Sequence, residues 1–342
     1  MTPQNQPRPL TVDPSWKPIR LADVEVKGGG VPIVENLLMK GAITLLSARE
    51  KVGKTTLISH LAKVAYQPGG GEFLGQKVTP SKILYVSEEP ALVWAARRDD
   101  DDAPEDMEVI LRPIGTSHGH QSWVDFCRHI LAHANEHDTD LVILDTWMHF
   151  NPSESENNNS DVSKAIKPVQ MIADAGLGVL LIHHHAKNGG VRGGTALPSA
   201  VELIINMTRP TRTGPDGATE ERLDDRDRIF KMIGRFPGPS EIRATWTGDR
   251  YDVDQSAIVR HPATAIREER LLATLSKLGT ATSGEIKRAW PKDGLSTGSD
   301  STFKRTLSEL VTQAKVMVRS GVGGAQDPKV YAVAGFKAGP KP

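Results

Sequence analysis

Residues 46–57, which read Leu-Ser-Ala-Arg-Glu-Lys-Val-Gly-Lys-Thr-Thr-Leu, constrain the fold more than any other stretch. An apolar run at 42–46 is typical of a short buried strand, and residues 57–65 have helical spacing. A loop between a strand and a helix that opens with Gly-Lys-Thr is the setting of a phosphate-binding loop. Its backbone N–H groups and the positive end of the helix can enclose a phosphate. The sequence therefore predicts an α/β unit built around a nucleotide site.

The residues of this loop have separate expected roles. Gly53 lets the backbone approach the phosphates, Lys54 can reach the β- and γ-oxygens, and Thr55 can place a hydroxyl on Mg²⁺. Ala48 stands where the pattern G-x-x-x-x-G-K-[ST] has its first glycine, which is the smallest departure available. The complete predicted nucleotide-binding set is Ala48, Glu50, Lys51, Val52, Gly53, Lys54, Thr55 and Thr56.

Two further apolar runs are each followed by acidic residues. Residues 83–86 precede Glu88 and Glu89, and residues 141–144 precede Asp145. In an open parallel sheet, ligands bind beyond the carboxyl ends of the strands. Asp145 is therefore expected to hold Mg²⁺ together with Thr55. One of the two glutamates is expected to orient and deprotonate a water molecule, the alternative being that they cap the helix that follows Pro90.

A third run, residues 177–182, ends in three histidines, His183, His184 and His185. Adjacent residues on a strand point to opposite faces, so the three cannot all bind one metal ion. A sensor of the γ-phosphate at the strand end is the better interpretation. The acidic run at 99–106 is interpreted as a solvated loop.

Three arginines are candidates for action on the γ-phosphate of a neighbouring subunit. Arg192 lies in a glycine-rich segment that could also contact DNA, whereas Arg209 and Arg235 are near or within runs with strand character. Residues 226–232, 234–236 and 241–246 are expected to be antiparallel strands that close the sheet.

The C-terminal portion changes character. Predicted helices at 268–278, 282–290 and 299–314 precede two β runs at 315–319 and 329–333, which is a winged-helix layout. The third helix, with Lys304 and Arg305, would enter a major groove. From residue 261 onward there are 13 Lys and Arg against 7 Asp and Glu, which favours DNA as the partner. The alternative is a winged helix that docks a protein.

The composition narrows the remaining possibilities. The sequence contains no run of 18 apolar residues, so no membrane span is expected. The first residues lack the apolar core of a signal peptide. The single cysteine, Cys127, excludes an internal disulfide and a cysteine-based zinc cluster. A cytoplasmic protein is expected, with a lead-in at 1–36, a core domain at 37–260 and a winged helix at 262–336.

Several segments together resemble the RecA-like AAA-type ATPases related to the RepA hexameric replicative helicases of plasmids and phages. They are 51–56, 85–90, 141–146, 184–187 and 192–197, within a resemblance that covers roughly residues 20–255. The resemblance implies a RecA-like core that binds Mg-ATP between subunits of a ring, with a hexamer expected. It also implies Glu89 as the catalytic carboxylate, with Glu88 as the alternative, and His184 as the sensor. Glu202 stands where the plasmid helicase has an arginine, so the residue that acts in trans stays open.

These observations predict an ATP-hydrolysing DNA-binding motor, a RepA-like helicase or replication protein of a mobile element. Single-stranded DNA would bind the core and duplex DNA the winged helix. Two alternatives stay open. One is an ATP-switched regulator that reads DNA through the winged helix, and the other is a scaffold ATPase that makes no DNA contact.

Overall fold

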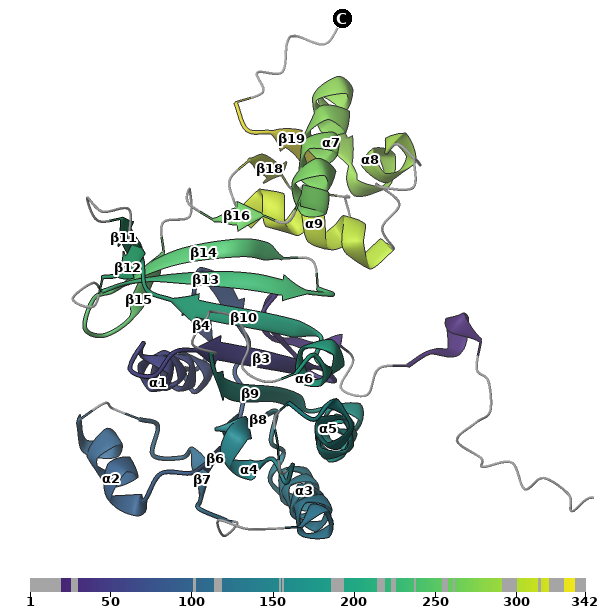
Figure 1. The fold of residues 1–342 in the computed structure, drawn as a ribbon. Coiled ribbons are helices and arrows are strands. Elements are labelled where there is room, and N and C mark those ends of the chain that lie inside the picture. The colour runs from purple at the N-terminus through teal and green to yellow at the C-terminus, as the bar shows by residue number, and fades with distance from the viewer. Residues whose placement is uncertain are drawn as a thin grey trace, which may run out of the picture.

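The computed structural model describes most of the chain from residue 20 to residue 335. The described ranges are 20–25, 30–100, 103–113, 119–153, 155, 157–185, 194–213, 219–222, 226–236, 238–253, 258–260, 262–290, 300–312, 315–319 and 329–335. Figure 1 shows a large twisted sheet with helices on both faces and a smaller C-terminal unit beyond one side of it. Arg192 lies within residues 186–193, which are outside the described ranges. Arg305 lies on a described helix, but its side chain is not described.

A ten-stranded sheet organises the chain, in the order β15-β14-β13-β10-β3-β9-β8-β6-β7 with β16 paired to β14. Its parallel part is β3 (Ile43–Ala48), β6 (Ile83–Ser87), β7 (Glu108–Leu111), β8 (Leu141–Asp145), β9 (Gly178–His184) and β10 (Leu203–Thr208). An antiparallel extension follows, with β13 (Asp227–Gly234), β14 (Pro239–Trp246), β15 (Tyr251–Val253) and β16 (Val259–Arg260). The antiparallel strands expected at 226–232 and 241–246 are present as β13 and β14, whereas of the run expected at 234–236 only Gly234 belongs to a strand, as the last residue of β13.

The central strands β3, β6 and β8 are buried along their whole length and mostly apolar, as expected of strands covered on both faces of the sheet. On β3, Leu46 and Ala48 pack into the core formed with α1 (Lys54–Ala65), whereas Ile43 and Leu45 pack into the opposite core. That second core contains residues of α3 (His120–His137) and α5 (Asn159–Asp174). The alternation follows from the two-residue period of a strand. Helices therefore pack on both faces of the central strands.

A four-stranded sheet joins the α1 side of the core, in the order β2-β1-β5-β4. Its strands are β1 (Pro32–Val34), β2 (Leu38–Met39), β4 (Gly71–Phe73) and β5 (Gln76–Val78). Ile33 and Val34 of β1 are fully buried in the same core as α1, so the packed unit begins before the expected domain start at residue 37.

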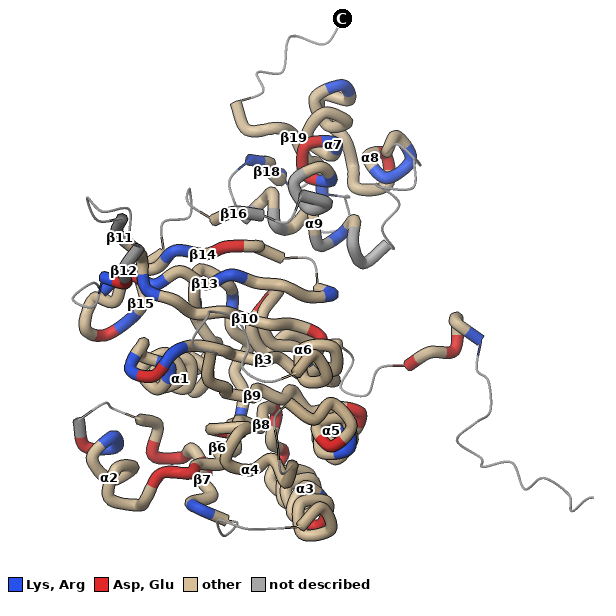
Figure 2. The backbone as a smooth tube through the Cα atoms, viewed as in Figure 1, with Lys and Arg blue, Asp and Glu red and all other residues tan. Residues whose placement is uncertain are grey.

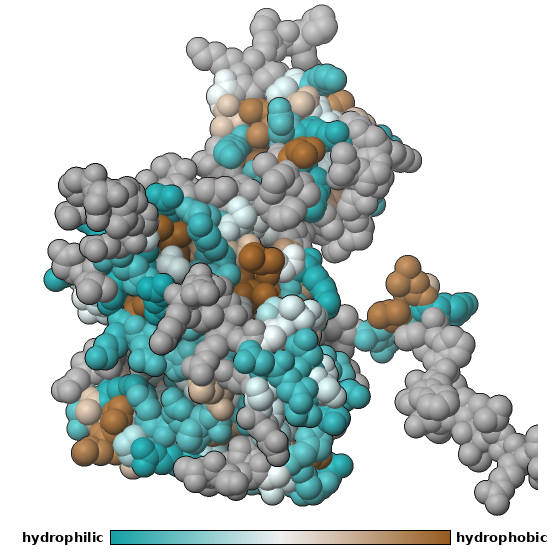
Figure 3. All heavy atoms as spheres, viewed as in Figure 1, coloured by the Kyte–Doolittle hydropathy of each residue, from teal (hydrophilic) through white to brown (hydrophobic). Residues whose placement is uncertain are grey.

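Shorter elements complete this part of the chain. They are η2 (Leu21–Asp23), α2 (Ala91–Asp100), α4 (Trp147–Phe150), α6 (Ala196–Ala200), β11 (Thr211–Thr213) and β12 (Thr219–Glu221). Helix α2 extends through Asp99 and Asp100, so the acidic run begins in a helix and not in a loop as expected. Leu21 of η2 is 90% exposed, and Figure 3 shows apolar side chains on this projecting segment.

The C-terminal unit has its own hydrophobic core. It contains α7 (Pro262–Leu278), β17 (Thr280–Thr282), α8 (Ser283–Ala289), α9 (Asp300–Thr312), β18 (Val316–Arg319) and β19 (Val330–Val333). Strand β19 lies between β17 and β18, and β17 is an element that sequence patterning did not predict. Thr282 and Glu285 form a reciprocal capping box at the start of α8, which fixes where that helix begins.

Candidate active site

The strand register brings the predicted polar residues to one edge of the large sheet. Ser87 of β6 pairs with Asp145 of β8, and Ala48 of β3 pairs with His184 of β9. These four residues end their strands, and β6, β8, β9 and β3 are neighbours in the sheet. The loop after Ala48 therefore meets the residues that follow Ser87 and Asp145, as the sequence predicted.

The loop between β3 and α1 has two residues in the left-handed region. Lys51 has φ 58° and Gly53, the residue before α1, has φ 103°. Left-handed residues alternating with right-handed ones are typical of loops that direct successive N–H groups toward an anion. An added Cβ at Gly53 would lie 3.4 Å from the Tyr251 hydroxyl, at a φ that side chains disfavour. Ala48 is paired on both sides within β3, so the first position of the pattern does not require glycine here.

Lys54, the first residue of α1, lies across this loop. Its Nζ donates to the carbonyl oxygens of Ala48 at 3.4 Å and Arg49 at 3.2 Å, and lies 3.4 Å from Nδ1 of His184. Burial lowers the pKa of the Lys54 ammonium, while the carboxylates of Asp145, Glu50 and Glu88 act in the opposite direction. His184 is therefore within reach of the lysine that is expected to hold the γ-phosphate, which is where a sensor would need to be.

Asp145 is 8% exposed and accepts a hydrogen bond from the Tyr85 hydroxyl. Burial raises the pKa of its carboxyl to about 6, and the nearby carboxylates of Glu88 and Glu89 add to this, whereas Tyr85 and Lys54 oppose it. Thr55 and Tyr85 line one small cavity between α1 and β6. A carboxylate and a hydroxyl are the hard oxygen donors that Mg²⁺ prefers, so the side chains of Asp145 and Thr55 have the chemistry that suits that ion.

The two glutamates after β6 face different partners. Oε2 of Glu88 lies 3.3 Å from the Thr146 hydroxyl and 3.4 Å from Nδ1 of His149, on the side of Asp145. Glu89 forms an ion pair with Arg97 of α2 instead. The resemblance implied Glu89 with Glu88 as the alternative; the ion pair of Glu89 with Arg97 favours Glu88, and the choice between them stays a prediction. The residue spacing alone did not contain this information.

Two arginines hold the phosphate-binding loop from the antiparallel side of the sheet. Arg209, just after β10, donates to the carbonyl oxygen of Lys51 at 2.6 Å. Arg228 on β13 is buried and donates from Nε to the carbonyl oxygen of Val52, also at 2.6 Å. In the single chain Arg209 contacts the loop of its own subunit, and its action on a neighbouring subunit stays a prediction. Arg228 was not among the predicted residues.

The other predicted residues lie away from this edge. Arg235 pairs with Glu202 at 3.0 Å, and Glu202 also accepts from the N–H of Ile43 at the start of β3. Arg235 is therefore at the opposite edge of the sheet from its own phosphate-binding loop. Lys304 is exposed on α9 in the C-terminal unit.

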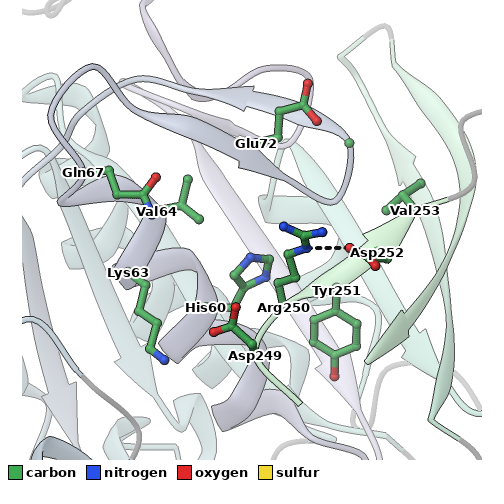
Figure 4. A pocket seen from close by; sticks show the side chains of 11 residues that line it. His60, Lys63, Val64, Gln67, Glu72, Asp249, Arg250, Tyr251, Asp252 and Val253 are labelled. Atoms are coloured by element: carbon green, nitrogen blue, oxygen red, sulfur yellow. Dashed lines mark hydrogen bonds and ion pairs between the residues drawn. The ribbon is translucent and has the colours of Figure 1, made fainter. Parts of the chain in front are cut away.

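A second cavity, of about 710 Å³, lies beside the C-terminal half of α1. Figure 4 shows His60 and Lys63 on the α1 side, facing Asp249 and Arg250 from the turn before β15. His60 is buried against the rings of Phe73 and Tyr251, at 5.5 and 6.2 Å between centroids. Burial lowers the pKa of His60 to about 4. None of the residues predicted to bind nucleotide lines this cavity.

A phosphate-binding loop between a strand and a helix, with carboxylates and a histidine at the ends of adjacent parallel strands, defines a P-loop nucleotide-binding protein. Residues 31–190 match the family model described as an AAA domain. This match supports a P-loop AAA-type ATPase domain with a RecA-like core, and hence nucleotide binding and ATPase activity in general. No curated protein matches the chain. Within the described residues, no helix is both long and apolar enough to cross a membrane.

Proposed function

We propose that the protein is an ATP-hydrolysing DNA-binding motor, a RepA-like helicase or replication protein that works as a ring-shaped oligomer, with six subunits expected. The observation that carries the ATPase part is the meeting of Lys54, Asp145 and Glu88 at one sheet edge. There the Lys54 ammonium is subject to the charges of both carboxylates.

In this proposal the loop residues from Ala48 to Thr56 bind the phosphates of ATP. Their backbone N–H groups and the Lys54 ammonium stabilise the negative charge of the phosphate oxygens. Thr55 and Asp145 would hold Mg²⁺, which supplies further neutralisation of that charge when bound. Arg209 and Arg228 keep the loop in its shape through the carbonyl oxygens of Lys51 and Val52.

Glu88 would act as the general base. It orients a water molecule and accepts its proton while the water oxygen bonds to the γ-phosphorus and the bond to the bridging oxygen of ADP breaks. The Thr146 hydroxyl and the His149 ring lie within 3.4 Å of its carboxylate and can keep it oriented. His184 ends β9 and would respond to loss of the γ-phosphate through its contact with Lys54.

The C-terminal unit is proposed to be a winged helix that binds duplex DNA, while single-stranded DNA binds the ATPase core. Its element order and separate core support this assignment. The excess of basic residues from 261 onward and the exposed Lys304 on α9 favour a nucleic acid over a protein partner.

A continuous set of contacts connects the phosphate-binding loop to the start of the C-terminal unit. Arg228 holds the Val52 carbonyl from β13, β13 pairs with β14, and β14 pairs with β16. Strand β16 ends at Arg260, two residues before α7 begins. In this proposal, a change in the conformation of the loop on ATP hydrolysis is transmitted through β13, β14 and β16 to the DNA-binding unit. Such a path favours a second candidate function, an ATP-switched DNA-binding regulator.

Steady-state ATPase rates measured alone, with single-stranded DNA and with duplex DNA distinguish the two functions. The motor predicts strong stimulation by single strands. The regulator predicts a low rate that single strands leave unchanged, together with duplex binding that differs between ATP and ADP. Absence of DNA binding at low salt, where phosphate contacts are strongest, would contradict both and favour a scaffold ATPase.

A further inference from the structure

We propose that Glu108, His133 and His137 form a binding site for a divalent transition-metal ion of the Zn²⁺ class, independent of the proposed function. Glu108 begins the edge strand β7, and both histidines lie on the C-terminal half of α3. Acidic positions gather around β6 and β7 in Figure 2. The site would join a helix to the outermost strand of the sheet.

The three side chains already converge. Nε2 of His133 lies 3.0 Å from Oε2 of Glu108, and Nδ1 of His137 lies 3.0 Å from Oε1 of the same carboxylate. The two imidazole rings stack, with centroids 4.1 Å apart and an interplanar angle of 17°. One ligand atom from each residue can be chosen so that all three lie within 4.8 Å of one another.

This spacing suits metal coordination. Residues at i and i+4 share one face of a helix, which is the arrangement of paired zinc-binding histidines. Imidazole nitrogens and a carboxylate oxygen suit Zn²⁺, and tetrahedral ligands with bonds of ~2.1 Å lie ~3.4 Å apart. Small side-chain rotations would bring the trio to that spacing. Three protein ligands leave a fourth position for water.

The site is accessible and separate from the nucleotide site. The side chains of Glu108, His133 and His137 are 39%, 25% and 42% exposed, so an ion can enter from solvent. Glu108 pairs with Leu84 near the start of β6, whereas Glu88 and Asp145 lie at the opposite ends of the strands. The Lys82 ammonium, which donates to the carbonyl oxygen of His137 at 3.0 Å, is a positive charge nearby that weakens cation binding. The binding constant is therefore expected to be moderate.

The test uses untagged full-length protein with excess Mg²⁺, titrated with Zn²⁺ by calorimetry and with Co²⁺ by visible absorbance. His129, one turn before His133 on α3, is outside the trio and provides the matched control. Wild type and His129→Ala should bind one equivalent and give the absorbance of nitrogen- and oxygen-coordinated Co²⁺. His133→Ala, His137→Ala and Glu108→Gln should each lose at least about tenfold in affinity.

Thermal unfolding gives a second readout that does not depend on spectra. Zn²⁺ should raise the melting temperature of wild type and of His129→Ala but not of the three site variants, because only a native site gains stability from binding. Glu108→Gln keeps the shape of the side chain, so its loss of binding cannot be ascribed to misfolding. Equal Zn²⁺ affinity in wild type and all three site variants, or loss of binding in His129→Ala, would overturn the proposal.

Discussion

Arg228 on β13 donates from its Nε to the carbonyl oxygen of Val52 at 2.6 Å, which joins the phosphate-binding loop to a strand 176 residues later in the sequence. Arg228 is buried, and the Tyr251 hydroxyl on β15 lies close to Gly53 of the same loop. The antiparallel extension of the sheet therefore supports the loop from the side opposite β9.

Replacing Arg228 by Met should loosen the loop and weaken ATP binding. A hydrogen bond from a charged donor contributes about 1.5–3 kcal/mol, which corresponds to an increase in the KM for ATP of roughly tenfold or more. Arg243 on β14 bonds to Glu241 on its own strand and is exposed, so Arg243→Met is the matched control. An unchanged KM in folded Arg228→Met protein would show that the contact does not support the loop.

Lys54→Ala should reduce ATP turnover by at least about 100-fold, because removal of one charged donor at a developing phosphate charge has effects of this size. The fold should persist, since Lys54 contributes no apolar packing to the core around α1. Lys63→Ala removes a lysine from the last turn of the same helix, away from the loop, and should have a much smaller effect. Turnover rates with circular dichroism as a check on folding provide the measurement, and wild-type turnover by Lys54→Ala would refute the assignment of the site.

His60 should make stability depend on pH between about 4 and 6.5. Its pKa is lowered from 6.5 to about 4 by burial, so the unfolded chain binds a proton more readily than the folded one. Stability from this group is therefore complete above pH 6.5 and decreases as the pH falls toward 4, by up to about 3 kcal/mol.

Denaturant unfolding of wild type and His60→Phe across this range measures the effect. The Phe variant keeps a ring against Phe73 and Tyr251 but cannot be protonated, so its stability should change less with pH. Identical pH profiles for the two proteins would contradict the prediction.

Local patterns identified the elements that carry the site, because each depends on a short stretch of sequence. The apolar strands before Glu88, Asp145 and His184 and the loop around Gly53 could be located in this way, since buried parallel strands are apolar throughout. The same apolar patterns predicted that the residues following these strands lie at one edge of the sheet.

Contacts between distant segments could not be predicted in this way. The bonds of Arg209 and Arg228 to the loop require the register of β13 against β10 and of β10 against β3. The trio of Glu108, His133 and His137 likewise depends on how α3 packs beside β7. His133 and His137 are four residues apart in the sequence, but local spacing does not reveal the carboxylate that faces them.

The choice between the two glutamates also depended on tertiary contacts. Both follow β6 directly, and Arg97 of α2 pairs with one of them. Glu88 is left beside Thr146 and His149 on the side of Asp145. Replacing each glutamate in turn therefore compares the two candidates for the general base directly.

The most direct test of the account is the steady-state ATPase rate of Glu88→Gln compared with that of Glu89→Gln, with nucleotide affinity measured for both. Loss of a general base lowers turnover by about 100-fold to 10,000-fold. The account predicts such a loss for Glu88→Gln with ATP binding retained, and a much smaller change for Glu89→Gln. Near wild-type turnover by Glu88→Gln, with the loss in Glu89→Gln instead, would contradict it.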